Sequence, residues 1–321
     1  MSVAIALLAG VTIAAPHLLR LESAHPATAA TIWLSAICLR ALVVLFAAIY
    51  VIFYLPATGL FSLVTHWCWD TLPVLTGQRG VDGHRIGDAA LLAPLLGISA
   101  SLAWVCFGLW RAARVVSRWI QRITIGPGPQ HSVIVGEHDI FVAAAGLRRP
   151  RVIVSAGALT TFDDEELAAS VAHEHGHIAR FHRVALLTAE IARAVARFLP
   201  GTQQAINELV FQLERDADQW ALRQLHDPAA LASAICKAAR PHIEPCTVLL
   251  TLGGGGVTQR VRQLLVPSPG VPTRRKRFDL VAGGMAILVA ALTVALPLAG
   301  VAGAALNSHS THKTAEHHCR D

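Results

Sequence analysis

The sequence predicts a mainly α-helical membrane protein, with four transmembrane helices and a cytoplasmic α+β domain between the third and the fourth. Three observations predict this fold class. Hydrophobic residues make up 54% of the 321 residues and charged residues only 15%, whereas soluble domains usually carry about 25% charged residues. Four apolar runs are close to the roughly 20 residues that cross a bilayer as a helix. Basic residues gather beside the third and the fourth of these runs.

The apolar runs divide the chain into four parts. We expect a membrane domain at 1–110 with spans at about 3–19, 32–55 and 89–110, a central domain at 111–277, a fourth span at 278–305 and a tail at 306–321. The first run is followed, not preceded, by a basic residue, so we interpret it as a retained span rather than as a signal peptide. Arg40 interrupts the second run, and we expect its side chain to reach the membrane interface or the span to begin later.

Basic residues also predict the orientation of the spans. They flank the central domain on both sides, at Arg111, Arg114, Arg118, Arg122, Arg274, Arg275, Lys276 and Arg277. Because loops rich in arginine and lysine stay in the cytoplasm, we expect a cytoplasmic central domain and external N- and C-termini. Arginines that face anionic lipid explain much of the net charge of +6. We therefore expect the lipid bilayer, and no direct nucleic acid, as a partner.

Short strands precede a long helix in the central domain. Residues 132–135 and 140–144 alternate well enough to predict two short strands. Residues 151–155, with the sequence Arg-Val-Ile-Val-Ser, are rich in β-branched side chains and predict a better strand. Asp163 is a good N-cap, and Glu166 follows three residues later, which is the spacing of a capping box. A helix is therefore expected to begin here.

The expected helix carries the motif His-Glu-His-Gly-His at 173–177, which has the H-E-x-x-H spacing. Residues four apart lie on one face of a helix, so His173 and His177 can bind one zinc ion through their imidazoles. Glu174 can act as general base on the attacking water without binding the metal. We expect His182, beyond the motif, to be a helix-surface residue rather than a ligand.

Two histidines leave a zinc site one protein ligand short. The run 213–218, Leu-Glu-Arg-Asp-Ala-Asp, offers Glu214, which completes the His₂Glu set of catalytic zinc sites. Asp218 is one helical turn further on and can accept the N–H of a ligating histidine. Two alternatives stay open: Glu208 is the ligand instead, or the run is the ordinary charged face of an amphipathic helix.

Several stretches together resemble the antirepressor-type membrane zinc metallopeptidases of the BlaR/MecR kind, which are related to the HtpX and CaaX-prenyl membrane proteases. The similar stretches are 149–159, 165–167, 173–177, 214–218, 227–232 and, more weakly, 260–265. The layout of three spans, a protease and a fourth span is similar too. The resemblance implies a gluzincin fold, in which two active-site helices lie beside a small sheet, in a bacterial cell membrane.

The resemblance also implies roles for single residues. By this resemblance, the zinc ligands are His173, His177 and Glu214. Glu174 is the catalytic base, and Asp218 supports the site. In zincins an edge strand pairs with the substrate backbone, and we expect residues 151–155 to be that strand.

The activity implied by the resemblance is that of an integral-membrane zinc metalloendopeptidase that cleaves a cytoplasmic protein, namely a transcriptional repressor. An HtpX-like quality-control protease and a non-catalytic membrane signalling protein are the alternatives, and a homodimer is left open. Two departures from the pattern stand out. The tail at 306–321 is too short to fold as the extracellular penicillin-binding domain of BlaR/MecR sensors, so we expect no β-lactam sensing through such a domain. His182 replaces an acidic residue often found just after the motif helix.

Overall fold

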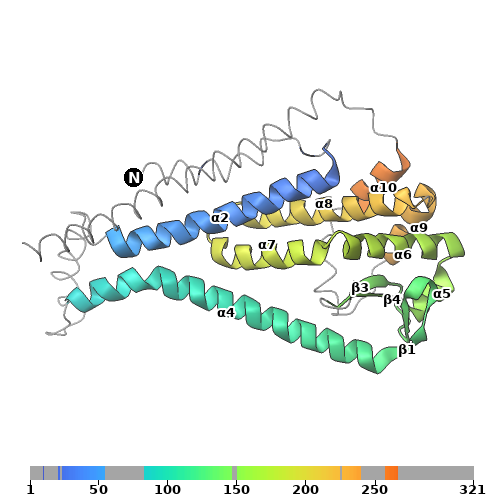
Figure 1. Cartoon of the computed structure of the whole chain (residues 1–321), viewed down its shortest axis with the longest axis horizontal. Coiled ribbons are helices and arrows are strands. Elements are labelled where there is room, and N and C mark those ends of the chain that lie inside the picture. The colour runs from blue at the N-terminus through green and yellow to red at the C-terminus, as the bar shows by residue number, and fades with distance from the viewer. Residues whose placement is uncertain are drawn as a thin grey trace, which may run out of the picture.

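The computed structural model describes residues 24–54, 83–146, 150–224, 226–239 and 257–266, together with the single residues 10 and 21. In this part of the chain most residues are helical, and long helices run beside one another with a small sheet near one end (Figure 1). The spans expected at 3–19 and 278–305 and the tail at 306–321 lie outside the described residues, except for residue 10.

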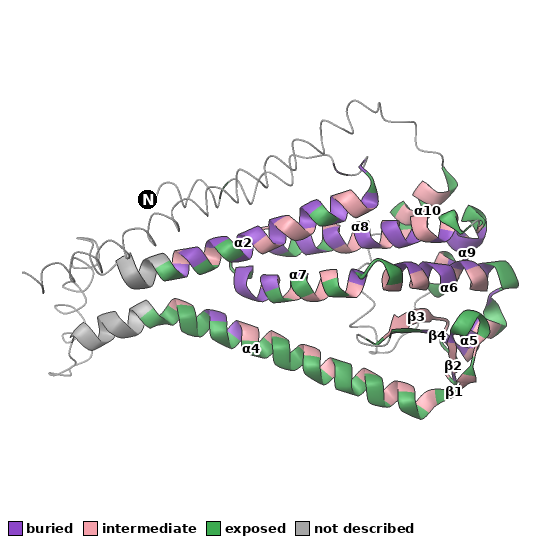
Figure 2. Cartoon of the chain, viewed as in Figure 1, coloured by how far each residue is buried: buried purple, intermediate pink, exposed green. Residues whose placement is uncertain are grey.

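Two described helices, α2 (Pro26–Tyr54) and α4 (Gly83–Ile123), are long and apolar enough to cross a membrane, by length and composition alone. Their candidate spans, Pro26–Ile49 and Leu92–Ile123, overlap the second and third apolar runs. Most of the side chains of α4 are exposed (Figure 2). The helix continues without a break beyond residue 110, so the arginines that follow the apolar run stand on the same helix.

A core of apolar side chains joins α2 to α7 (His182–Ala196) and α8 (Thr202–Arg223). Its fully buried members include Ile37, Ile206 and Leu209. The first candidate span is thus packed along the helices that follow the H-E-x-x-H motif.

Arg40 lies inside this core instead of reaching outward. Its side chain is fully buried, and its Nη1 donates a 2.9 Å hydrogen bond to the carbonyl oxygen of Gly201, in the turn between α7 and α8. A buried guanidinium is stable only when polar partners replace its water. The expectation that the Arg40 side chain reaches outward to an interface was therefore wrong, because its partner comes from a distant segment that the local hydropathy pattern does not reveal.

The sheet has four short strands: β1 (Thr124–Pro127), β2 (Val133–Val135), β3 (Val142–Ala145) and β4 (Arg151–Ser155). Their order is β1-β2-β4-β3, with β2 and β4 parallel and the other two pairs antiparallel. A short 3₁₀ helix, η3 (Pro129–His131), connects β1 to β2.

The position of β4 corrects the expectation that residues 151–155 form the edge strand. Strand β4 lies between β2 and β3, and its residues from Val152 to Ser155 are buried. A strand with neighbours on both sides and a continuous buried run is typical of a sheet centre. The edges of the sheet are β1 and β3.

Helix α6 (Asp164–Ala179) begins with the expected capping box, directly after the short helix α5 (Ala156–Thr161). Asp163 Oδ1 accepts the backbone N–H of Glu166, and Glu166 Oε2 accepts the backbone N–H of Asp163. Glu166 also reaches α9 (Pro228–Ala238), where Ser233 Oγ and Lys237 Nζ donate to it at 2.6 Å each. One carboxylate thus caps the motif helix and fastens it to α9.

Replacement of Glu166 by glutamine is expected to destabilise the protein by about 1–3 kcal/mol at neutral pH, because a buried charge-assisted network is lost. Burial raises the pKa of Glu166, but the bonds from Lys237, Ser233 and the Asp163 backbone outweigh it and lower the pKa. The carboxylate therefore stabilises the fold fully above its unfolded pKa of about 4.3, and this stability is lost as pH falls through the lower folded value. In thermal unfolding in detergent, the melting temperature of the wild type should exceed that of Glu166→Gln by a constant amount at pH 6–8, and this difference should disappear in acid. An equal difference in melting temperature at low pH contradicts a stabilising role of the Glu166 carboxylate.

Candidate metal centre

Helices α6 and α8 approach each other very closely at Gly176, inside the H-E-x-x-H motif. A Cβ atom added to Gly176 would lie 2.9 Å from Cβ of Trp220 and 3.2 Å from Cα of Ala217. Any larger residue would force the two helices apart. The glycine therefore sets the short interhelical distance that lets α8 present its acidic residues to the histidines of α6.

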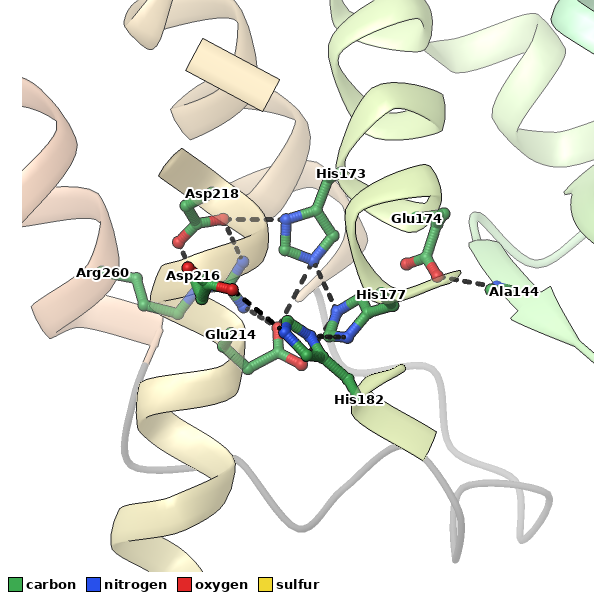
Figure 3. A network of polar contacts seen from close by, with 9 residues as sticks. All are labelled: Ala144, His173, Glu174, His177, His182, Glu214, Asp216, Asp218 and Arg260. Carbon is green, nitrogen blue, oxygen red and sulfur yellow. Dashed lines mark hydrogen bonds and ion pairs between the residues drawn. The ribbon is translucent and has the colours of Figure 1, made fainter. Parts of the chain in front are cut away.

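Three side chains converge where these helices meet (Figure 3). Nε2 of His173 and Nε2 of His177 are 3.1 Å apart, and the Glu214 carboxylate oxygens lie 3.5 Å and 3.4 Å from them. Ligands about 2.0–2.1 Å from a tetrahedral zinc ion stand about 3.3 Å from one another. Both the chemistry of the three donors and their spacing fit a zinc ion.

The charges of the cluster also suit a cation. Burial lowers the pKa of His173, but the bonds to Asp218 and Glu214 outweigh it and raise the pKa to about 10. Burial lowers the pKa of His177 to about 3, so this imidazole is neutral. Although burial alone raises the pKa of Glu214, its bond to His173 and the charge of Arg260 hold that pKa well below the usual range. The Glu214 carboxylate therefore stays ionised and offers a negative charge to a bound cation.

Asp218 and Arg260 hold two of these groups in place. Nδ1 of His173 lies 2.9 Å from Oδ1 of Asp218, a short contact whose angle departs from that of an ideal hydrogen bond. Arg260, on α10 (Val257–Leu265), donates through Nε and Nη2 to the Asp218 carboxylate and through Nη1 to Glu214 at 2.6 Å. The guanidinium lowers the cost of keeping two carboxylates side by side in a buried place.

Glu174 lies on the other side of α6, toward the sheet. Its Oε2 accepts a 2.7 Å hydrogen bond from the backbone N–H of Ala144, on edge strand β3. Burial raises the pKa of Glu174, although the charge of His173 opposes this. A raised pKa makes the carboxylate a stronger base.

A second chain of contacts leads away from His177. The turn after α6 passes through Phe181, at a φ of 55°, which is the left-handed region. The next residue, His182, is buried, which corrects the expectation of a helix-surface position. Its Nδ1 lies 2.9 Å from Nδ1 of His177, and its Nε2 lies 3.2 Å from Oδ2 of Asp216.

The structure joins four of the predicted site residues, His173, His177, Glu214 and Asp218, by polar contacts, whereas the fifth, Glu174, is bonded to Ala144 (Figure 3). The alternative ligand Glu208 stands six residues before Glu214, about 9 Å away along the helix axis. Sequence reasoning missed the parts played by Arg260, His182 and Asp216. The available signals were the position of Asp216 inside the acidic run and the weak resemblance around Arg260.

Residues 111–208 match the model of Peptidase family M48. The matched segment includes the end of α4, the sheet, α6, α7 and the start of α8, and so contains His173, Glu174 and His177 but not Glu214. No curated protein and no solved structure gives a match to the chain. The similarity covers less than a third of the chain and supports a metallopeptidase. Because the matched residues end before Glu214, the match and the position of Glu214 beside the histidines are separate observations.

Proposed function

We propose that this protein is an integral-membrane zinc metalloendopeptidase with His173, His177 and Glu214 as its zinc ligands. One observation carries the proposal: donor atoms of His173, His177 and Glu214 lie within 4.8 Å of one another, and Glu174 directly follows His173 on the same helix. The similarity to Peptidase family M48 over 111–208 supports it, as do the two helices long enough to span a membrane. A non-catalytic signalling protein would not need such a complete set of groups.

The side chains of the site have different roles in peptide hydrolysis. A zinc ion held by the three ligands would polarise the scissile carbonyl and acidify the attacking water. Glu174 accepts the proton of that water as its oxygen bonds to the carbonyl carbon, and returns a proton to the nitrogen as the C–N bond breaks. Asp218 and Arg260 keep His173 and Glu214 oriented throughout.

Edge strand β3 offers the substrate a backbone to pair with. The backbone N–H of Ser155 donates to the carbonyl oxygen of Phe141, so the alternation of an antiparallel ladder turns the N–H and C=O of Val142 and Ala144 away from β4. The contact from Ala144 to Glu174 has this same outward direction. An extended substrate added at this edge would run directly past Glu174.

For the substrate, we propose a cytoplasmic protein, in the first place a transcriptional repressor. The resemblance of 149–265 to BlaR/MecR-type peptidases and the four arginines at the end of α4 support this proposal. Quality control of membrane proteins is the second candidate, favoured by the match to Peptidase family M48 because HtpX-type proteases resemble the same stretches.

Replacement of Glu174 by glutamine should lower the rate of zinc-dependent cleavage of casein by about 100-fold or more, since general base catalysis contributes about 10²–10⁴-fold. The purified full chain in detergent should keep its zinc content. Glu165→Gln is the matched control, because Glu165 lies exposed on the same helix. Equal cleavage by the two variants contradicts the mechanism.

Val142→Pro should reduce kcat/KM by about tenfold without loss of zinc, because proline removes one outward N–H worth about 1–1.5 kcal/mol to a bound strand, while the bond from Ala144 to Glu174 stays in place. Val142→Ala keeps the N–H and should retain activity. Cleavage by the proline variant at the rate of the alanine variant would show that β3 does not bind the substrate.

The Glu174→Gln form should trap the substrate in membranes of the native host, since binding groups stay intact while hydrolysis stops. Mass spectrometry of the captured proteins is expected to find a cytoplasmic DNA-binding repressor that the wild type does not retain. A trapped set of damaged membrane proteins would instead favour the quality-control candidate.

A further inference from the structure

His182 and Asp216 form a buried pair next to the candidate zinc site, and the mechanism above does not use them. The side chains are 4% and 2% exposed, respectively. The rings of His177 and His182 are nearly perpendicular, with centroids 4.9 Å apart and planes at 82°. Their Nδ1 atoms are 2.9 Å apart, which is a hydrogen-bond distance, so the contact is directional and not mere packing.

We propose that His182 and Asp216 are positioning residues that fix the tautomer of His177 and thereby keep its Nε2 free for zinc. This inference rests on the proposed zinc site. His177 directs Nε2 to His173 and Glu214, so its Nδ1 is the nitrogen left for other partners. Two nitrogens 2.9 Å apart share one hydrogen, so either His177 or His182 donates at their contact.

Asp216 decides which of the two imidazoles donates. A carboxylate only accepts hydrogen bonds, so Nε2 of His182 must carry the hydrogen that points to Oδ2 of Asp216. A neutral His182 then has a lone pair on Nδ1 and accepts the N–H of His177. His177 with hydrogen on Nδ1 has its lone pair on Nε2, which is the form that binds a metal.

The other motif histidine, His173, is oriented by a carboxylate directly, without a second histidine in between. Nδ1 of His173 lies directly against the Asp218 carboxylate. Asp216 is two residues away from Asp218 on α8, and residues two apart do not share a helix face. His182 bridges this offset, so that one helix can orient both histidines of the motif from two different faces.

Two nearly isosteric variants separate the proposed role from simple packing. The amide of His182→Asn stands where Nδ1 of the imidazole was and can still accept from His177, whereas that of His182→Gln stands near Nε2 and cannot. Zn²⁺ affinity of the full chain in detergent, measured by competition with a chromophoric chelator, should stay within about threefold for the asparagine variant. It should fall about 10–100-fold for the glutamine variant, as for other lost partners of metal-binding histidines. The d–d absorption of the Co²⁺-loaded protein should change only in the glutamine variant.

Each outcome decides for or against the pair. Wild-type affinity in His182→Gln, or equal losses in both variants, overturns the proposal. Thermal unfolding of the metal-free protein shows whether His182→Gln is folded. If it is not, Asp216→Leu is compared with Asp216→Asn instead, and only the leucine variant should bind Zn²⁺ more weakly. Equal Zn²⁺ affinity of these two variants overturns the proposed role. A wild type that binds no Zn²⁺ would refute the zinc site itself, which separates the two failures.

Discussion

The close approach of α6 and α8 at Gly176 is the contact on which the site depends. The histidines stand on one helix and the carboxylates on the other, so neither helix alone has a metal site. A glycine facing Trp220 lets the backbones approach until Glu214 comes within 3.5 Å of both imidazoles. The network around Glu166 holds the start of α6 against α9, which keeps the motif helix from shifting along its neighbours.

The features predicted from sequence are those that local chemistry determines. The capping box at Asp163, the strand at 151–155 and the i, i+4 histidines follow from spacing within a few residues. Glu214 and Asp218 could be proposed because the ligand set was one short and because one turn of helix separates them. The structure places these residues together, and the match to Peptidase family M48 supports the metallopeptidase class.

The features that sequence reasoning missed depend on contacts between distant segments. The β-branched run at 151–155 predicts a strand but not its neighbours, so its place inside the sheet could not be known. Arg260 stands 42 residues after the Asp218 that it binds. His182 is polar, as most surface residues are. It becomes buried only because the turn at Phe181 folds it back onto His177 and Asp216.

The site is also tied to the two candidate membrane helices. Polar groups inside such helices are stable only when they are paired. Arg40 of α2 binds the carbonyl of Gly201, and Oγ of Ser101 of α4 donates a 2.7 Å bond to the carbonyl of Ala194. Both acceptors lie around the turn between α7 and α8, and α8 then runs unbroken to Glu214. The helices that satisfy these polar groups, α7 and α8, thus include the helix that supplies Glu214 to the metal cluster. Segments on either side of the expected boundary at residue 110 therefore pack against each other, and a central domain cut free at that point would leave the acceptors of Arg40 and Ser101 without these contacts.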